Sequence, residues 1–195
     1  MRLFILLAML VPVILVSGCV SPVKKTSIAS LNYDFDLYLG IFETIRDKHI
    51  PLIGLNLPFH IPPKIAVGGI ANLLPEDAAH LPRSMTLTDP EHRAYVETIF
   101  NMHKFMGRNN FEYFYEAQCV WEDAMAEAIA RNLTQRKLIV LTGNGHIINK
   151  FGIPNRAFSR THAPFKTLCL APVGSPVELS YGDYIWITGT EESKK

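Results

Sequence analysis

Apolar residues recur along this chain with two different spacings, one typical of helices and one of buried strands. The longest helical pattern covers residues 111–133, where apolar side chains return every three to four positions. Short and nearly continuous apolar runs are instead typical of strands that are buried on both faces. Helices alternating with such strands favour an α/β fold, a mostly parallel sheet flanked by helices on both faces. The pattern predicts further helices over 34–48, 62–74, 88–106 and 147–150, and strands over 51–56, 138–141, 167–172 and 184–188.

The first eighteen residues have the composition of an export signal rather than of a folded segment. Residues 3–16 form an uncharged apolar run behind Met1-Arg2, shorter than the roughly 20 residues that a membrane-spanning helix needs. The sequence VSGC that follows resembles a bacterial lipobox, so we expect residues 1–18 to be a lipoprotein signal peptide and Cys19 to be lipidated. Residues 19–31 would be a tether to one domain over 32–195. A plain secretory signal with an incidental cysteine is the alternative.

This signal also predicts where the protein resides. Val20, rather than aspartate, follows the lipidated cysteine, a pattern that resembles sorting to the bacterial outer membrane. Acyl chains would then hold the protein at the periplasmic face without a transmembrane segment. The formal net charge is only +1, which disfavours nucleic acid as a partner. Cys119 and Cys169 either pair in this oxidising compartment or remain buried free thiols.

A first candidate site follows the apolar run 138–141. Ligands of parallel sheets gather at the carboxyl ends of the strands, which is where this run ends at Gly143, Gly145 and His146. We expect the two glycines to permit positive φ and a close approach of backbone to a ligand. Histidine at such a turn can bind iron or zinc, act as a base, or donate to an anion. The alternative is a histidine that only satisfies local backbone.

Gln118 and Glu122 interrupt the otherwise apolar face of the long helix. Buried polar groups need partners, so we expect these two to bond to each other and to orient the imidazole of His146. The alternative is that Gln118 and Glu122 are partly solvated at the rim of the helix. Asp123 is expected to lie on the flank of this helix face.

The aromatic cluster at the start of that helix is a further candidate. Tyr113 and Tyr115 are candidate haem-iron ligands, because tyrosinate binds haem iron and aromatic surface suits a porphyrin. Aromatic residues at helical spacing also pack in ordinary cores, so this alternative stays open.

Three segments together resemble the ChaN-like lipoproteins, a haem-binding uptake family of the Tiki superfamily. They are GLNLP at 54–58, FYEAQCVWEDAMAEAIA at 114–130 and VLTGNGHIINKFGIPNR at 140–156. The resemblance implies that residues 143–146 are the second of the superfamily's two GxxH motifs, and that Gln118 with the following acidic pair is its helix element. Family members more often carry Trp-Asp-Glu where this chain has Trp121-Glu122-Asp123, which leaves open which acid acts.

The resemblance covers only the family's C-terminal portion. A Gly-Glu-x-His motif, expected in the first half, does not occur between the lipobox and Asn32. The domain would therefore lack the family's N-terminal half, and the sheet edge left exposed would favour a homo-oligomer or a missing half supplied by another chain.

Two functions are consistent with this pattern. The first is a lipid-anchored periplasmic protein that binds haem for haem and iron uptake, with His146, Tyr113 or Tyr115 as candidate ligands. The alternative is a metal-dependent hydrolase of the Tiki or erythromycin-esterase-like type, in which His146 would bind a divalent metal or act as base and Glu122 would activate water. We favour haem binding, because a catalytic metal would lack the ligands of the first motif. A half-domain without function is a third interpretation.

Overall fold

The computed structural model describes residues 4–8, 35–102, 109–133 and 137–189. The predicted helices and strands in these ranges are present, and two helices were not predicted. One is a single turn that begins at Pro75, and the other follows Gly152, where proline occupies the first turn and begins a helix instead of ending one. The helices are α1 Leu39–Asp47, α2 Ile61–Gly68, α3 Pro75–Ala78, α4 Pro90–Met102, α5 Phe111–Asn132 and α6 Ile153–Thr161, and the strands are β1 Phe4–Ala8, β2 Leu52–Gly54, β3 Leu138–Thr142, β4 Leu168–Pro172 and β5 Tyr184–Thr188.

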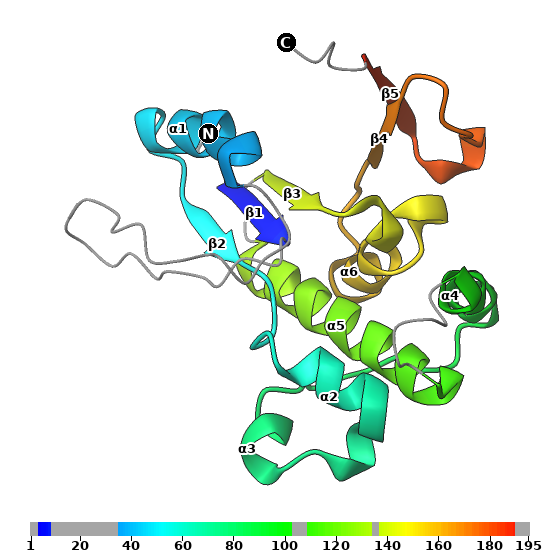
Figure 1. Ribbon diagram of the computed structural model, residues 1–195. Coiled ribbons are helices and arrows are strands. Elements are labelled where there is room, and N and C mark those ends of the chain that lie inside the picture. The colour runs from blue at the N-terminus through cyan, green and yellow to red at the C-terminus, as the bar shows by residue number, and fades with distance from the viewer. Residues whose placement is uncertain (1–3, 9–34, 103–108, 134–136, 190–195) are drawn as a thin grey trace.

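The main sheet has three parallel strands in the order β2-β1-β3. Its central strand comes from the apolar segment that we expected to be a signal peptide outside the fold (Figure 1). Ile5 is in register with Leu52 on one side and with Ile139 on the other. This segment therefore joins β2 to β3, which do not pair with each other. Cys19 and the tether lie outside the described residues, so their predicted roles remain predictions.

Helices α5 and α6 cover one face of this sheet. A core of Leu55, Met125, Ala128, Ile129 and Ile153 joins α5 and α6 to the inward side chains of β2 and β3. Side chains alternate along a strand, so Leu52 and Ile139 point the other way, and they are 44% and 41% exposed. All strand pairs are parallel, as expected, but the expectation of helices on both faces is not met by the described residues.

The last two strands form a second sheet of their own. β4 pairs with β5 in parallel, and this pair lies apart from the first sheet (Figure 1). Cys169 is buried on one face of β4, whereas Leu170 and its register partner Trp186 are exposed on the other. Cys169 and Cys119 are both buried free thiols, which resolves the alternative of a disulfide.

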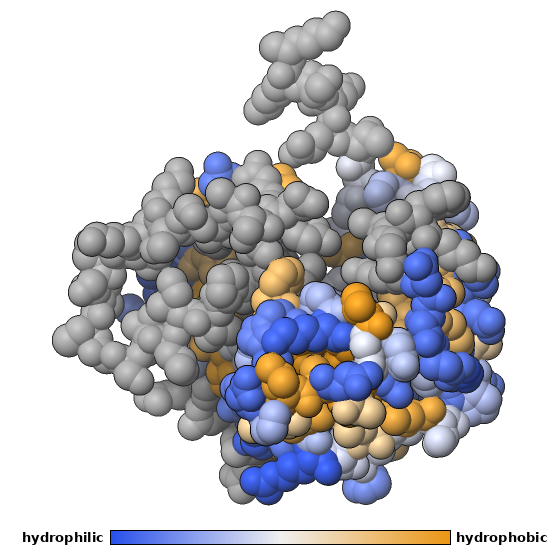
Figure 2. Space-filling view, turned by 60° about the horizontal axis from the view of Figure 1, so that its bottom comes forward, coloured by the Kyte–Doolittle hydropathy of each residue, from blue (hydrophilic) through white to orange (hydrophobic). Residues whose placement is uncertain are grey.

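Helix α5 is the centre of the molecule, because α2, α4 and α6 all pack against it. On the α2 side, Ile61 and Ile65 meet Val120 in a buried cluster, and on the α4 side Val96 and Phe100 pack around Tyr115. Figure 2 brings the α2–α3 end of the molecule forward, where apolar and polar surface are interspersed. Among the described ranges, no helix has the length and apolar character to cross a membrane. Because α2, α4 and α6 pack around α5, the polar side chains of α5 are enclosed by neighbours on several sides.

Candidate functional site

Glu122 is the centre of a polar cluster inside this packing. It lies one turn after Gln118 on α5, and the Gln118 Nε2 donates to Glu122 Oε1 over 2.6 Å. His146, on the short turn that follows β3, places its Nδ1 3.1 Å from the same oxygen and 3.1 Å from Gln118 Nε2. The predicted contacts among these three residues are therefore present. The side chain of Glu122 is completely buried and that of His146 is 15% exposed, so this is an enclosed cluster rather than a solvated helix rim.

The second carboxylate oxygen of Glu122 faces a histidine that the sequence did not identify. His92 on α4 is 1% exposed, and its Nε2 lies 3.0 Å from Glu122 Oε2. The ring N–H is not well directed at that oxygen, and neither atom makes a well-directed hydrogen bond elsewhere in the described residues. Arg156 Nε approaches the same oxygen at 3.4 Å. Burial tends to raise the pKa of Glu122, but the contacts with His146 and His92 outweigh it and hold the pKa at about 2, so the group is a carboxylate.

Asp123 was expected to flank the face that carries Gln118 and Glu122, and at that position it is fully buried. It forms ion pairs with the guanidinium groups of Arg156 and Arg160, and it accepts a hydrogen bond of 2.8 Å from the Thr86 backbone N–H. The reason is that α6 packs along this flank of α5 and brings both arginines against it. Of the two adjacent acids, Glu122 is the one that contacts His146.

The charges of the cluster determine the tautomers that we infer for its histidines. Two buried carboxylates and two arginines balance, so neutral histidines leave no excess charge. Arg156 Nη2 lies 3.3 Å from His92 Nδ1 and can only donate, so His92 carries its proton on Nε2, toward Glu122. Glu122 Oε1 can only accept, so His146 donates from Nδ1 and retains a lone pair on Nε2. An imidazole held in this way is prepared to bind a metal centre through Nε2.

The glycine that this arrangement requires is Gly152, not the two that we expected. Gly152 has φ +69°, and a Cβ at this position would lie 2.6 Å from Glu122 Oε1 and 2.8 Å from the His146 carbonyl oxygen. Gly143 has an ordinary φ of −66°, and Gly145 is not among the positive-φ residues. The positive φ that glycine permits is therefore not used at these two positions, because the chain leaves β3 through a short helical turn with negative φ, and their close approach to a ligand stays a prediction.

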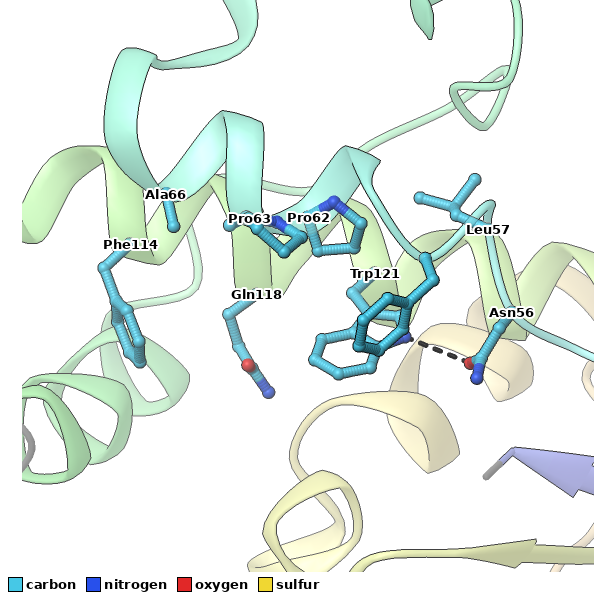
Figure 3. Close-up of a pocket in the computed structure, with 10 residues that line it drawn as sticks. Asn56, Leu57, Pro62, Pro63, Ala66, Phe114, Gln118 and Trp121 are labelled. Carbon is cyan, nitrogen blue, oxygen red and sulfur yellow. Dashed lines mark hydrogen bonds between the residues drawn. The ribbon is translucent and has the colours of Figure 1, made fainter. Parts of the chain in front are cut away.

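An apolar groove of about 250 Å³ borders the cluster between α2 and α5. Phe114, Gln118 and Trp121 project into it from the same side of α5 (Figure 3). The Trp121 Nε1 donates to Asn56 Oδ1 over 3.0 Å, which fixes the indole. The ring of Trp121 meets that of His146 edge to face, with centroids 5.2 Å apart. Gln118 and Trp121 thus connect the groove to the polar cluster, and the other lining residues are Leu57, Phe59, Pro62, Pro63, Ala66 and Ala117.

The two candidate tyrosines lie away from this groove. Tyr115 is 2% exposed in the α4–α5 packing, its hydroxyl donates to the Asp89 carbonyl oxygen over 3.2 Å, and burial raises its pKa. Tyr113 packs against Gly69, where a Cβ would lie 2.8 Å from the tyrosine ring. Neither tyrosine lines the groove. The structure gathers Gln118, Glu122 and His146, but not the tyrosines, around one site.

The sequence contains only weak indications of His92 and Arg156, which were not predicted as site residues. His92 recurs with Val96 and Phe100 at a spacing of four on α4, which places it on the buried stripe of that helix. Arg156 belongs to a segment quoted for the family resemblance, but the pattern predicted no helix or strand around it. Within the described part of the chain, no group of three or more histidine, cysteine, aspartate or glutamate side chains is arranged to hold a metal ion.

Comparisons with known proteins agree with this architecture. A protein-family model described as "Haem-binding uptake, Tiki superfamily, ChaN" matches residues 24–157. Among solved structures, the chain is similar to that of "Cofacial heme binding to ChaN of Campylobacter jejuni", with a TM-score of 0.55 and 16% sequence identity. The similarity covers 94% of this chain and 72% of the other, and at this identity it shows a shared fold alone. The comparison with curated protein sequences finds no match.

Proposed function

Because the chain belongs to the haem-binding uptake family ChaN of the Tiki superfamily, we propose that it binds haem for iron acquisition at the groove beside His146. One observation carries this proposal: His146 is held through Nδ1 by a buried carboxylate, and its neighbours Gln118 and Trp121 line an apolar groove. A metal-binding histidine typically donates its other ring N–H to a carboxylate in this manner. Nε2 of His146 would bind the haem iron.

The residues of the groove fit such a ligand. Phe114 and Trp121 provide aromatic surface, and Gln118 is one of only two polar residues that line it. The volume of about 250 Å³ lies below the roughly 300–1,000 Å³ of ordinary ligand pockets, so the groove would hold part of a porphyrin and leave the rest at its rim. The groove supplies apolar contact, the neighbouring imidazole supplies the iron ligand, and Glu122 keeps that imidazole oriented.

The cellular setting is a second part of the proposal. Cys19 in the lipobox-like VSGC sequence supports a lipid-anchored protein on the periplasmic face of the bacterial outer membrane. Cleavage before Cys19 would remove β1, so the anchored form would hold β2 and β3 without the strand that lies between them here. Leu52 and Ile139, exposed on the open sheet face, support assembly with a second copy or with another chain. The family assignment favours haem over a divalent metal, and no observation favours the hydrolase alternative.

Titration of the purified protein with haemin tests the binding site. We expect a saturable change in the Soret band for the wild type, and a loss of at least about tenfold in affinity for His146→Ala. His80→Ala is the matched control, because His80 is an exposed histidine outside the cluster, and it is expected to bind as the wild type does. Equal affinities of His146→Ala and wild type would refute His146 as the ligand. A selective loss in Tyr113→Phe would assign the iron to that tyrosine instead.

A further inference from the structure

His92 is a polar ring enclosed in an otherwise aromatic part of the core. It is 1% exposed on α4, and its ring packs at a tilt against Tyr115, with centroids 5.5 Å apart, and against Phe151, at 6.4 Å. These contacts restrict the rotation of the ring. A buried imidazole is costly unless its nitrogens meet partners, so the two groups that it faces explain its position.

The two nitrogens of His92 face groups of opposite character. Nδ1 lies 3.3 Å from Arg156 Nη2, which can only donate, and Nε2 lies 3.0 Å from Glu122 Oε2, which can only accept. The ring therefore lies between the arginine and the carboxylate, with its Nε2 proton on the side of the carboxylate although the N–H is not well aligned with Oε2. Without it, Glu122 Oε2 would keep only Arg156 Nε, at 3.4 Å, and the carboxylate would be less firmly oriented.

The orientation of this carboxylate decides between two states of His146. Glu122 Oε1 and Gln118 Nε2 both lie 3.1 Å from His146 Nδ1. If Nδ1 donates to Glu122, the lone pair remains on Nε2, whereas if Nδ1 accepts from Gln118, Nε2 carries the proton and cannot bind iron. Gln118 Nε2 at present donates to Glu122 Oε1 over 2.6 Å, so a firmly held Glu122 occupies the amide that would otherwise compete for the ring.

We propose that His92 is a positioning residue, which holds Glu122 so that His146 keeps the tautomer with a free Nε2 lone pair. The consequence for ligand binding rests on the proposed function, but the tautomer itself is a property of the protein without haem. His92 touches neither the groove nor the iron ligand and acts only through Glu122.

Two substitutions of His92 separate this role from simple core packing. Glutamine places its amide near the position of Nε2 and can still donate to Glu122, whereas asparagine reaches only the position of Nδ1. Long-range proton–nitrogen correlation spectra of the histidine rings report the tautomer at about pH 8, where an ordinary histidine is neutral. We expect His146 to be protonated at Nδ1 in the wild type and in His92→Gln, and mainly at Nε2 in His92→Asn. An unchanged tautomer in a folded His92→Asn protein would overturn the inference.

Haemin binding by the same variants supplies an independent measurement. We expect His92→Asn to lose roughly tenfold in affinity, as is typical when a residue supporting a metal ligand is removed, and His92→Gln to stay within about threefold of wild type. Equal losses in both variants would indicate a packing role and contradict the proposal. If the wild type bound no haemin, the proposed function would fail, while the tautomer would still decide whether His92 positions His146.

Discussion

Replacement of Gly152 by alanine probes the polar cluster most directly. The new Cβ would lie 2.6 Å from Glu122 Oε1, 2.7 Å from its Cδ and 2.8 Å from the His146 carbonyl oxygen. Two of these contacts are with the carboxylate that orients His146, and the third is with backbone, which cannot move without moving the turn after β3. The substitution therefore combines steric overlap with backbone strain at the site itself.

The size of the effect can be worked out from these two contributions. A residue other than glycine at a φ of +69° costs about 1–3 kcal/mol in the free energy of unfolding. Forcing an extra methyl group into a packed interior typically costs about 1–3 kcal/mol more. We therefore expect Gly152→Ala to lower the free energy of unfolding by about 4 kcal/mol.

Gly174 provides the matched control for this experiment. It has φ +83°, but a Cβ there would meet nothing within 4 Å, so Gly174→Ala carries the backbone strain without the overlap. Urea denaturation of both variants measures the difference, which we expect to be about 2 kcal/mol. A difference below about 0.5 kcal/mol would mean that the Glu122 carboxylate does not lie against Gly152, and the geometry of the cluster would be refuted.

Three further predictions concern individual groups. The native pKa of Glu122, about 2, lies below its ordinary value of 4.5, so the stability that this group contributes is present above pH 4.5 and lost as the pH falls toward 2. Urea denaturation across this range should show a loss of stability that is missing in Glu122→Gln, and parallel pH profiles would contradict it. Burial raises the pKa of Cys119 to about 11, so this thiol should react with a thiol reagent only after unfolding, and rapid labelling of the native protein would disprove its burial. Mass spectrometry of protein extracted from membranes should find an acylated Cys19 at the N-terminus, and an intact Met1 in that fraction would exclude the lipoprotein.

The spacing of apolar residues predicted the long helix over 111–133 and the strand that precedes His146. Gln118 and Glu122 are four residues apart, and any helix brings such a pair together on one face. His146 follows a strand directly, and the end of a strand is a fixed position in a parallel sheet. The pairing of Gln118 with Glu122 depends only on the geometry of one helix, whereas their contact with His146 required α5 to pack against the end of β3, as the position of the motif after a strand led us to expect.

The failures of prediction involve contacts between distant segments. The close approach at Gly152 depends on how α6 packs against α5, whereas the sequence alone pointed to Gly143 and Gly145. The burial of Asp123 was not predicted, because the arginines that pair with it belong to α6, a helix that the sequence pattern did not predict.

By itself, the sequence determined the periodicity of the helices and strands, membership of the family, and which polar residues share one helix face with a histidine close by. Only the tertiary structure decided that His92 and Arg156, separated by 64 positions, meet on the far side of Glu122, and that the apolar segment Phe4–Ala8 lies between β2 and β3. The physical reason is that hydrogen bonding within an element follows from its regular backbone, whereas a buried carboxylate obtains its remaining partners from whichever elements pack around it.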